Sequence, residues 1–364
     1  MPPAAMKRFH PWAAVLTTLS AVAMAAATTG AAASLNASAV AAACPGVFAR
    51  GAVLTRVADA TFGEGPLDFP EAHATLFTDW AHWAPTPPKV FLYERDSGAV
   101  RLWMRNASVN GMARMPNGDV ALAPRANRSV GVMANPGVAA KAVVTVATAY
   151  QGRRLNAPND LVVDDGGGIF FTDPTWGVEE VDRELDFKGV YYLPPGGGND
   201  DLQLIATQTW PNGLGLLPDG RLLVANEQEP LGWYLYTRQA GAASGWTRAL
   251  ITVPPLRPLL AHRGELAPAA DRRGNDGMHV DASGDGVTVY ATGYGGLYVM
   301  QPADGAGRWP VQCVLPPPPS VTTLTNVVTG ACGGSTAGGG CAPAAPRRCV
   351  YVTAEDGLYK IPLA

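Results

Sequence analysis

The chain has 364 residues, of which 47% are hydrophobic and 16% charged, and its formal net charge is −3. This globular composition has no basic excess, so no nucleic-acid partner is expected. Glycine and proline together make up about a fifth of the residues, and this density of turn formers favours many short strands over long helices.

The first 43 residues are typical of a secretory signal peptide followed by a leader of small residues. Lys7 and Arg8 precede an apolar stretch, WAAVLTTLSAVAMAAA, which passes into small residues. A membrane anchor is the alternative, but this stretch is rich in Ala and Thr and falls short of the roughly 18–20 strongly apolar residues of a span. We therefore expect a secreted or extracytoplasmic protein with no stable membrane span in the mature chain.

A motif of two strands recurs about every 50 residues from residue 60 to the end of the chain. Each copy opens with a polar residue, continues with an apolar strand and a turn rich in Asp, Asn and Gly, and ends with a second apolar strand. The last copy is degenerate and resumes at RRCVYVTAEDGLYKI. The opening residues of the six copies are Glu64, Asn110, Asn159, Asn212, Asp276 and Asn326.

Runs between the copies, such as KVFLYERDSGAVRLWM, supply two further strands for each copy. A repeat of this length with four strands predicts an all-β fold, a six-bladed β-propeller with four-stranded blades, formed as a single domain by residues 44–364. A helical fold is excluded because the chain beyond the leader has hardly a ten-residue window that is free of Gly and Pro and has a 3.6-residue apolar period.

The polar residue that opens each copy is expected to face the central channel, because the first strand of every propeller blade lines it. Two carboxylates, from Glu64 and Asp276, would then meet four carboxamides in a medium of low dielectric constant, and a bound cation would relieve their repulsion. The all-oxygen set favours Ca²⁺, with Mg²⁺, Mn²⁺ or Zn²⁺ as alternatives. The other interpretation is that these residues only satisfy main-chain groups at strand ends; recurrence in six copies favours the metal site.

Residues that follow the second strand of each copy are expected to surround the mouth of the channel. Aromatic and acidic side chains beside a metal ion suit a pocket for a small polar substrate. Four of these residues are therefore candidate substrate-binding residues, with Asp79, Trp80 and Asn226 at related positions. The four candidates are Asp173, Trp176, Glu227 and Tyr294.

The chain has five cysteines, which can form disulfides in an oxidising compartment. Three of the five fall within the last 35 residues, in a Gly-rich segment, so one local disulfide is expected there, with its pairing left open and an odd thiol left over. No Cys-x-x-Cys or Cys/His spacing typical of a metal site is present. The cysteines are Cys44, Cys313, Cys332, Cys341 and Cys349.

Four motifs carry a resemblance to a known family: GEGP (63–66), APNDLVVDDGGGIFFTDPTWG (157–177), PNGLGLLPDG (211–220) and NDGMHVDASG (275–284). Over roughly residues 60–360 the chain resembles the SMP-30/gluconolactonase/luciferin-regenerating-enzyme-like family of six-bladed propeller hydrolases. The resemblance implies a divalent metal ion bound by Glu64, Asn159, Asn212 and Asp276. It also implies that Asp276 is the catalytic base and that Asn110 faces the substrate.

The sequence therefore predicts a metal-dependent lactonase or esterase that acts on a small molecule, with a metal-polarised carbonyl and an activated water. Other hydrolase signatures, the Gly-x-Ser-x-Gly elbow and the His-Glu-x-x-His helix, are absent from the sequence. The alternative is a non-catalytic propeller that binds a ligand or partner and keeps a structural central ion. A strictosidine-synthase-like condensing propeller would not require the Glu, Asn, Asn and Asp set.

Overall fold

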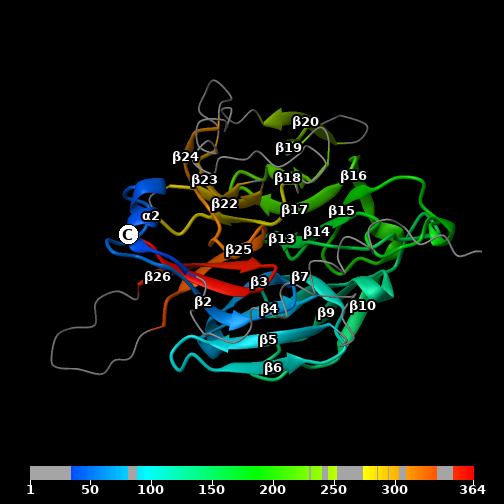
Figure 1. Ribbon diagram of the computed structural model, residues 1–364. Coiled ribbons are helices and arrows are strands. Elements are labelled where there is room, and N and C mark those ends of the chain that lie inside the picture. Colours follow the sequence, from blue (N-terminus) through cyan, green and yellow to red (C-terminus); the bar gives the residue numbers. More distant parts are fainter. Residues whose placement is uncertain are drawn as a thin grey trace, which may run out of the picture. The chain divides into compact units, whose positions relative to one another are not determined.

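The computed structural model describes residues 34–80, 88–228, 231–239, 245–251, 274–284, 286–293, 295–302, 309–333 and 347–364. Within these ranges, six small antiparallel sheets are arranged around one axis as a six-bladed β-propeller (Figure 1). The predicted all-β fold with four-stranded blades is confirmed. Residues 34–364 cluster as one compact unit, and the predicted signal peptide lies in residues outside the described ranges.

The first three blades follow one another in chain order, each running outward from the axis. The first contains β3 to β6 (Gly63–Phe69, Ala74–Asp79, Lys89–Glu94 and Val100–Met104). The second contains β7 to β10 (Val109–Arg114, Val120–Pro124, Val130–Met133 and Val143–Ala147). After a two-stranded ribbon of β11 and β12 (Ala149–Tyr150 and Arg153–Arg154), the third contains β13 to β16 (Leu161–Val163, Ile169–Asp173, Gly189–Leu193 and Gln203–Thr207).

The fourth and fifth blades repeat this order, and the sixth is completed by the N-terminal part of the chain. The fourth contains β17 to β20 (Pro211–Leu216, Leu222–Asn226, Gly232–Arg238 and Trp246–Ile251). The fifth contains β21 to β24 (Met278–Asp281, Thr288–Gly293, Gly296–Met300 and Val311–Leu315). The sixth contains β25, β26, β27, β2 and β1 (Leu324–Ala331, Arg348–Ala354, Gly357–Pro362, Leu54–Asp59 and Ser34–Leu35).

Helices in the described residues are short. They are α2 and the single-turn 3₁₀ helices η1 to η4 (Ala37–Ala43, Pro70–Ala72, Arg125–Asn127, Glu180–Asp182 and Asn199–Asp201). Among the described residues, none of the helices has the length and apolar character needed to cross a membrane.

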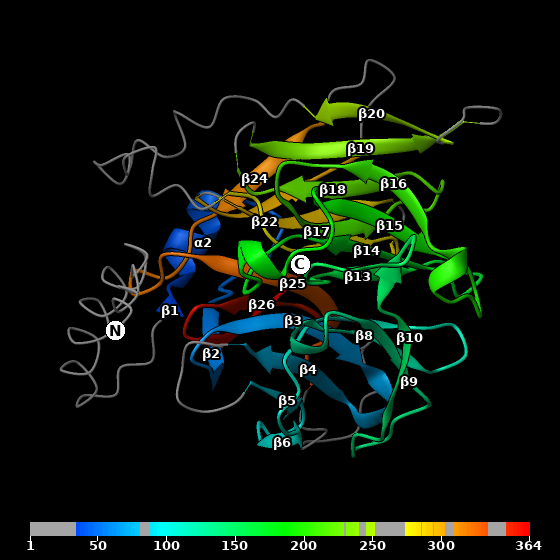
Figure 2. The same ribbon diagram turned by 90° about the vertical axis from the view of Figure 1, so that its right-hand side faces the viewer.

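Closure of the ring joins the two ends of the domain. Strand β2 pairs antiparallel with β27, so the sixth sheet contains strands from both ends of the chain. Helix α2 lies against β24 (Figure 2), and a disulfide joins Cys44, which follows the helix, to Cys313 in β24. Residues 34–43, which the sequence analysis placed in the leader, thus form β1 and α2 of the same compact unit.

The core lies between neighbouring blades, which explains why the second strand of each repeat is a continuous apolar run. In β8, Val120 and Leu122 pack towards the first blade, and Ala121 and Ala123 pack towards the third. Side chains of a strand alternate between the two faces of its sheet. Both faces of a blade are covered by the adjacent blades, so both sets must be apolar.

The predicted local disulfide near the C-terminus is confirmed. Cys332 at the end of β25 is bonded to Cys349 in β26. The second disulfide, between Cys44 and Cys313, joins residues 269 positions apart. Cys341, the fifth cysteine, lies outside the described residues.

Candidate active site

The polar residues that open the six repeats lie at the inner strands, as the sequence predicts. Glu64, Asn110, Asn212 and Asn326 lie at the beginning of β3, β7, β17 and β25. Asn159 and Asp276 lie two residues before the first residues of β13 and β21. The first strand of each blade contacts the first strand of the next, all the way around the axis. Five of the six residues are no more than 5% exposed, and Asp276 is partly exposed.

Main-chain hydrogen bonds between blades hold these positions together. The Gly111 N–H donates to the Asn159 carbonyl at 2.8 Å, and the Gly213 N–H donates to the Asp276 carbonyl at 3.2 Å. The glycine that follows the channel residue permits this approach. At Gly65, with φ of 44°, a Cβ would collide with the main-chain oxygen of the neighbouring blade.

Carboxamide groups on the third and fourth blades form a chain of hydrogen bonds. Asn159 Nδ2 donates to Asn212 Oδ1 at 2.8 Å, and Asn212 Nδ2 donates to Glu227 Oε2 at 3.3 Å. The Oδ1 atoms of Asn159 and Asn110 are buried and have no hydrogen-bond partner among the described residues. A buried carbonyl oxygen without a donor is costly, so both oxygens are suited to accept a cation or a ligand hydrogen bond.

Buried carboxyl groups complete the channel. Burial, reinforced by the nearby Asp160 carboxylate, raises the pKa of Glu64 to about 8. Burial also raises the pKa of Asp160 to about 6, against hydrogen bonds that include one from Asn326 Nδ2 at 3.2 Å. Both shifts have burial as their largest cause, and for Glu64 the Arg125 guanidinium offsets only part of the rise. A cation bound in the channel would lower both values.

Asp160 is a channel residue to which the sequence analysis assigned no role. It directly follows Asn159, at a position where four of the other repeats have glycine after the channel residue. This departure from glycine was the sequence signal that could have identified Asp160 as a channel residue. In the structure its carboxyl lies against Gly111 of the adjacent blade, where a Cβ would collide with it.

The predicted metal ligands fit a hard cation by their chemistry. Glu64, Asn159, Asn212 and Asp276 offer carboxylate and amide oxygens, which are the ligands that Ca²⁺ and Mg²⁺ use. Two structural observations are in favour: Asn159 Oδ1 has no partner among the described residues, and the buried Glu64 carboxyl has a raised pKa. No group of three or more His, Cys, Asp and Glu side chains arranged for a metal occurs in the part of the chain described here.

In three blades, the last residue of the second strand accepts hydrogen bonds from the main chain just before the first strand. The carboxylates of Asp79 and Asp173, and the carboxamide oxygen of Asn226, accept main-chain N–H groups from the residues before the first strand of their own blade. The bonds are Thr61 N and Phe62 N to Asp79, Asn156 N and Ala157 N to Asp173, and Trp210 N to Asn226, at 2.7 to 3.1 Å.

Asp173, a predicted substrate-binding residue, follows this pattern. The side chain is fully buried, and both carboxylate oxygens accept main-chain N–H groups. Asp173 does not line the pocket at the channel mouth. Asp173 ends β14, and its carboxylate holds the loop before β13. Its role in substrate binding stays a prediction.

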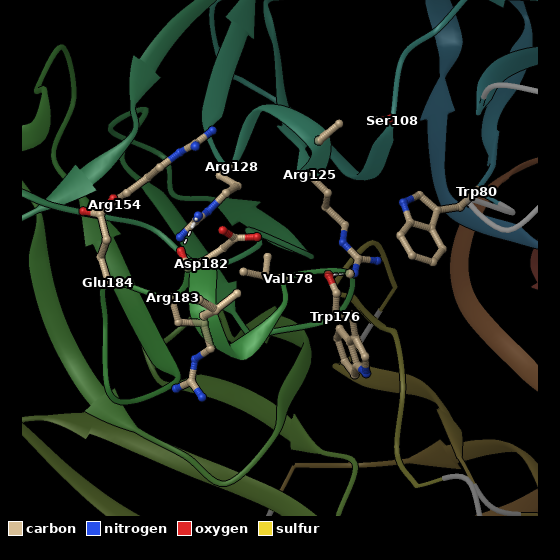
Figure 3. A pocket seen from close by; sticks show the side chains of 13 residues that line it. Trp80, Ser108, Arg125, Arg128, Arg154, Trp176, Val178, Asp182, Arg183 and Glu184 are labelled. Atoms are coloured by element: carbon tan, nitrogen blue, oxygen red, sulfur yellow. Dashed lines mark hydrogen bonds between the residues drawn. The ribbon is translucent and has the colours of Figure 1, made fainter. Parts of the chain in front are cut away.

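Residues directly after the second strand of a blade lie at the mouth of the channel. Trp80, Arg125 and Glu227 each follow the second strand of their blade, and Trp176 lies in the corresponding loop of the third blade. Arg125 lies over the Trp80 ring, 3.7 Å from its centroid, and 5.6 Å from that of Trp176 (Figure 3). Its Nη2 donates to the Trp176 carbonyl at 2.6 Å. Tyr294, the remaining candidate, lies outside the described residues.

Arg125 connects the mouth to the channel. Burial lowers the pKa of Arg125 to about 9, while the carboxylates of Glu64, Glu227 and Asp276 act in the opposite direction. The guanidinium therefore lies within electrostatic reach of all three. The sequence analysis missed this residue, although Arg125 follows Asn110 by the same interval that separates Glu227 from Asn212.

The mouth opens into a pocket of about 670 Å³. Trp80, Arg125 and Trp176 form the side nearest the channel, and the predicted substrate-binding residue Trp176 is thus at the pocket. The volume suits a ligand of small-molecule size. The opposite side carries further charged residues from the segment between η2 and β9, from β12 and from around η3.

A six-bladed propeller with a polar, oxygen-rich channel and an aromatic mouth defines a class of small-molecule-binding propellers. The chain belongs to the SMP-30/gluconolactonase/LRE-like family, whose model matches residues 62–324. That range contains all four predicted metal ligands.

Comparison with individual proteins agrees with this membership. A gluconolactonase from Zymomonas mobilis is 28% identical over 260 residues, which cover 67% of this chain and 68% of that protein. A gluconolactonase from Xanthomonas campestris has the same fold, with a TM-score of 0.65 at 22% identity over 92% of this chain and 96% of that one. Regucalcin, a calcium-binding protein from Agrobacterium tumefaciens, gives 0.55 at 14% identity over 84% and 92%.

Proposed function

We propose that the protein is a lactone hydrolase that requires a divalent metal ion. The observation that carries this proposal is the convergence of Glu64, Asn159, Asn212 and Asp276 on one channel in a chain related to gluconolactonases. The pocket beside the channel is of the size that a sugar lactone needs.

We infer that the four convergent residues hold the cation, with Ca²⁺ the first choice and Mg²⁺, Mn²⁺ and Zn²⁺ as alternatives. When bound there, a divalent ion supplies electrophilic polarisation of the lactone carbonyl. Asn159 and Asn212 contribute neutral oxygens, and Glu64 contributes charge from a buried position, where its attraction for a cation is little screened by water.

Asp276 is assigned as the general base. It is the partly exposed member of the channel set, so water can reach its carboxylate, which accepts a proton as the water oxygen bonds to the carbonyl carbon. The ring C–O bond then breaks, and the ring oxygen takes up a proton, so the product is a hydroxy acid. The unpartnered Oδ1 of Asn110 orients a substrate hydroxyl by accepting its hydrogen bond.

We also propose that the protein works outside the cytoplasm. The two disulfides are compatible with an oxidising compartment, and the first residues have the layout of a secretory signal.

The test is acid release from aldonolactones and aryl esters by the wild-type protein and by Glu64→Gln and Asp276→Asn. We expect hydrolysis of at least one lactone, and a fall of kcat by about 100-fold or more in Asp276→Asn, because general bases contribute on that scale. Asp59→Asn makes the same chemical change at an exposed site and should retain full activity.

Two outcomes would contradict the proposal. Unchanged hydrolysis in Asp276→Asn with the metal still bound would remove the general-base role. Tight metal binding with no hydrolysis of any lactone or ester would favour a binding propeller with a structural ion.

A further inference from the structure

The pocket beside the channel is rich in arginine side chains. Its lining includes the four arginines Arg125, Arg128, Arg154 and Arg183, against two acidic side chains, Asp182 and Glu184 (Figure 3). Opening a neutral lactone does not require this excess of positive charge. The question is therefore whether these guanidinium groups are already neutralised within the protein.

Three of the four arginines direct their hydrogen bonds to uncharged groups. Arg125 donates to the Trp176 carbonyl, Arg128 Nε donates to the Leu155 carbonyl at 2.7 Å, and Arg128 Nη1 donates to the Asp182 carbonyl at 2.9 Å. Arg154 Nη2 reaches the Asn127 carbonyl at 3.4 Å. A carbonyl oxygen satisfies a donor but leaves the formal charge of the guanidinium in place.

The carboxylates of Asp182 and Glu184 act electrostatically on Arg128, but neither accepts a side-chain hydrogen bond from an arginine among the interactions described. Glu184 Oε2 accepts the main-chain N–H of Arg154 at 2.7 Å. Arg183 differs from the other three arginines, because it forms an ion pair with Glu180 at 2.8 Å. Asp182 contributes its main-chain carbonyl to the Arg128 guanidinium. Within the pocket lining, four guanidinium groups face the carboxylates of Asp182 and Glu184, and Glu180 pairs with Arg183. The channel carboxylates Glu64, Glu227 and Asp276 also act on Arg125, and a divalent ion bound by Glu64 and Asp276 would take up part of their charge.

Two of the arginines are also buried with donors to spare. Arg125 and Arg128 are only 6% and 8% exposed. Arg125 Nε and Arg128 Nη2 have no hydrogen-bond partner among the described residues. Buried charge with an unfilled donor is unfavourable, and an anion with several acceptor oxygens would both satisfy donors and offset the charge.

We propose that this pocket binds an anionic substituent, a carboxylate or a phosphate, carried by the lactone substrate. The proposal rests on the proposed function, because it assigns the substrate class of the same site. Trp80 and Trp176 enclose the Arg125 guanidinium, which keeps water from it and strengthens its attraction for an anion. The protein then selects acidic sugar lactones over neutral ones.

The experiment compares matched pairs of substrates on the metal-loaded wild-type protein. D-Gluconolactone is compared with its terminal phosphate ester, and with D-glucarolactone, which carries a free terminal carboxylate. We expect kcat/KM to be about tenfold or more higher for at least one acidic lactone, and the preference to shrink as NaCl is added. The pair that shows the preference identifies the anion as phosphate or carboxylate.

Variants of the pocket arginines test whether the pocket causes the preference for acidic lactones. Arg154 is exposed, so Arg154→Gln is expected to fold and to lower the ratio of acidic to neutral kcat/KM by about threefold. Arg125→Gln should lower this ratio by about tenfold, and Arg125→Lys, which keeps the charge, should restore part of it. The matched control is Arg248→Gln, an exposed arginine that also donates to a main-chain carbonyl, at Thr207, and it should leave the ratio unchanged.

A binding measurement separates failure of this inference from failure of the proposed function. Calorimetry with 6-phosphogluconate and with gluconate needs no turnover. Tighter binding of the phosphorylated acid, weakened in Arg154→Gln, would support the anion pocket even if no lactone is hydrolysed. If neutral lactones are hydrolysed as well as acidic ones and the two acids bind equally, the pocket assignment is wrong while the lactonase stands.

Discussion

Asp173, which the sequence predicts to bind substrate, has a buried carboxylate that accepts two main-chain N–H groups. We expect Asp173→Ala to lower the free energy of unfolding by about 3 kcal/mol, because two buried main-chain N–H groups would lose their acceptor. Denaturant titration measures the loss. Asp164→Ala is the matched control: Asp164 also accepts two main-chain N–H groups, in a partly exposed turn, and should cost about 1 kcal/mol. Loss of activity in Asp173→Ala at unchanged stability would instead support the predicted substrate-binding role.

Asn110 and Asn326 both open a repeat, but their amide groups differ in what they contact. Asn326 donates to Asp160 and accepts from the Val327 N–H, whereas Asn110 Oδ1 has no partner in the described part of the chain. We expect Asn110→Ala to raise KM for a lactone by about tenfold, the value of one hydrogen bond to a substrate hydroxyl. Asn326→Ala serves as the comparison and should leave KM unchanged. Equal KM changes in the two variants would show that Asn110 has no special relation to substrate.

At the scale of elements, the alternation of side chains explains what the sequence could predict. Polar openings of the inner strands and apolar second strands were both visible, because each blade is buried on its two faces and lines the channel at one edge. The sequence therefore placed Glu64, Asn159, Asn212 and Asp276 together. Arg125 follows β8 in a 3₁₀ turn (η2). It was missed because the equivalent position in the fourth blade holds Glu227, so the position recurs but the type of residue does not.

His279, in strand β21 beside β25, is expected to make the stability of the protein depend on pH. His279 in β21 contacts Thr329 Oγ1 in β25 at 3.0 Å, and burial, with a further effect of Arg348, lowers the pKa of His279 to about 4, while Asp281 acts in the opposite direction. The unfolded histidine has a pKa of about 6.5, so between these values only the unfolded chain binds the proton. His279 therefore leaves the free energy of unfolding unchanged above about pH 6.5 and lowers it as the pH falls towards 4.

We expect this histidine to cost about 3 kcal/mol of unfolding free energy between about pH 6.5 and pH 4. His279→Gln keeps a donor for Thr329 and removes the titrating group, so its stability should fall less steeply over that range. Thermal melting across the range measures both proteins. The same slope in the variant and the wild type would contradict the assignment to His279.

At the scale of the whole molecule, closure of the ring was the feature that the sequence did not reveal. Strand β2 precedes the first repeat and belongs to no copy of the motif, so nothing in its residues marks it as the partner of β27. The Cys44–Cys313 bond was equally hidden, since pairing of distant cysteines depends on the tertiary fold. The repeat count, in contrast, predicted six blades because each blade is one local unit of sequence.

The two disulfides should differ in their effect on global stability. Cys44–Cys313 spans 269 residues and Cys332–Cys349 spans 17, and the entropy of loop closure in the unfolded chain grows with that separation. Replacing both cysteines by alanine should lower the unfolding free energy by about 5 kcal/mol for the long link and about 3 kcal/mol for the short one. Chemical denaturation of the two double variants measures the difference. A larger loss for the short link would contradict closure by the N-terminal segment.

The central claim is that the oxygen-rich channel holds a divalent ion that lactone hydrolysis requires. The most direct measurement is hydrolysis of aldonolactones, including D-glucarolactone and a phosphorylated gluconolactone, by protein stripped with chelator and then supplied separately with Ca²⁺, Mg²⁺, Mn²⁺ or Zn²⁺. We predict that activity is lost on stripping, returns with one of these ions and does not return in Glu64→Gln at the same ion concentration. Full activity in the stripped protein, or hydrolysis of no lactone with any ion, would contradict the account.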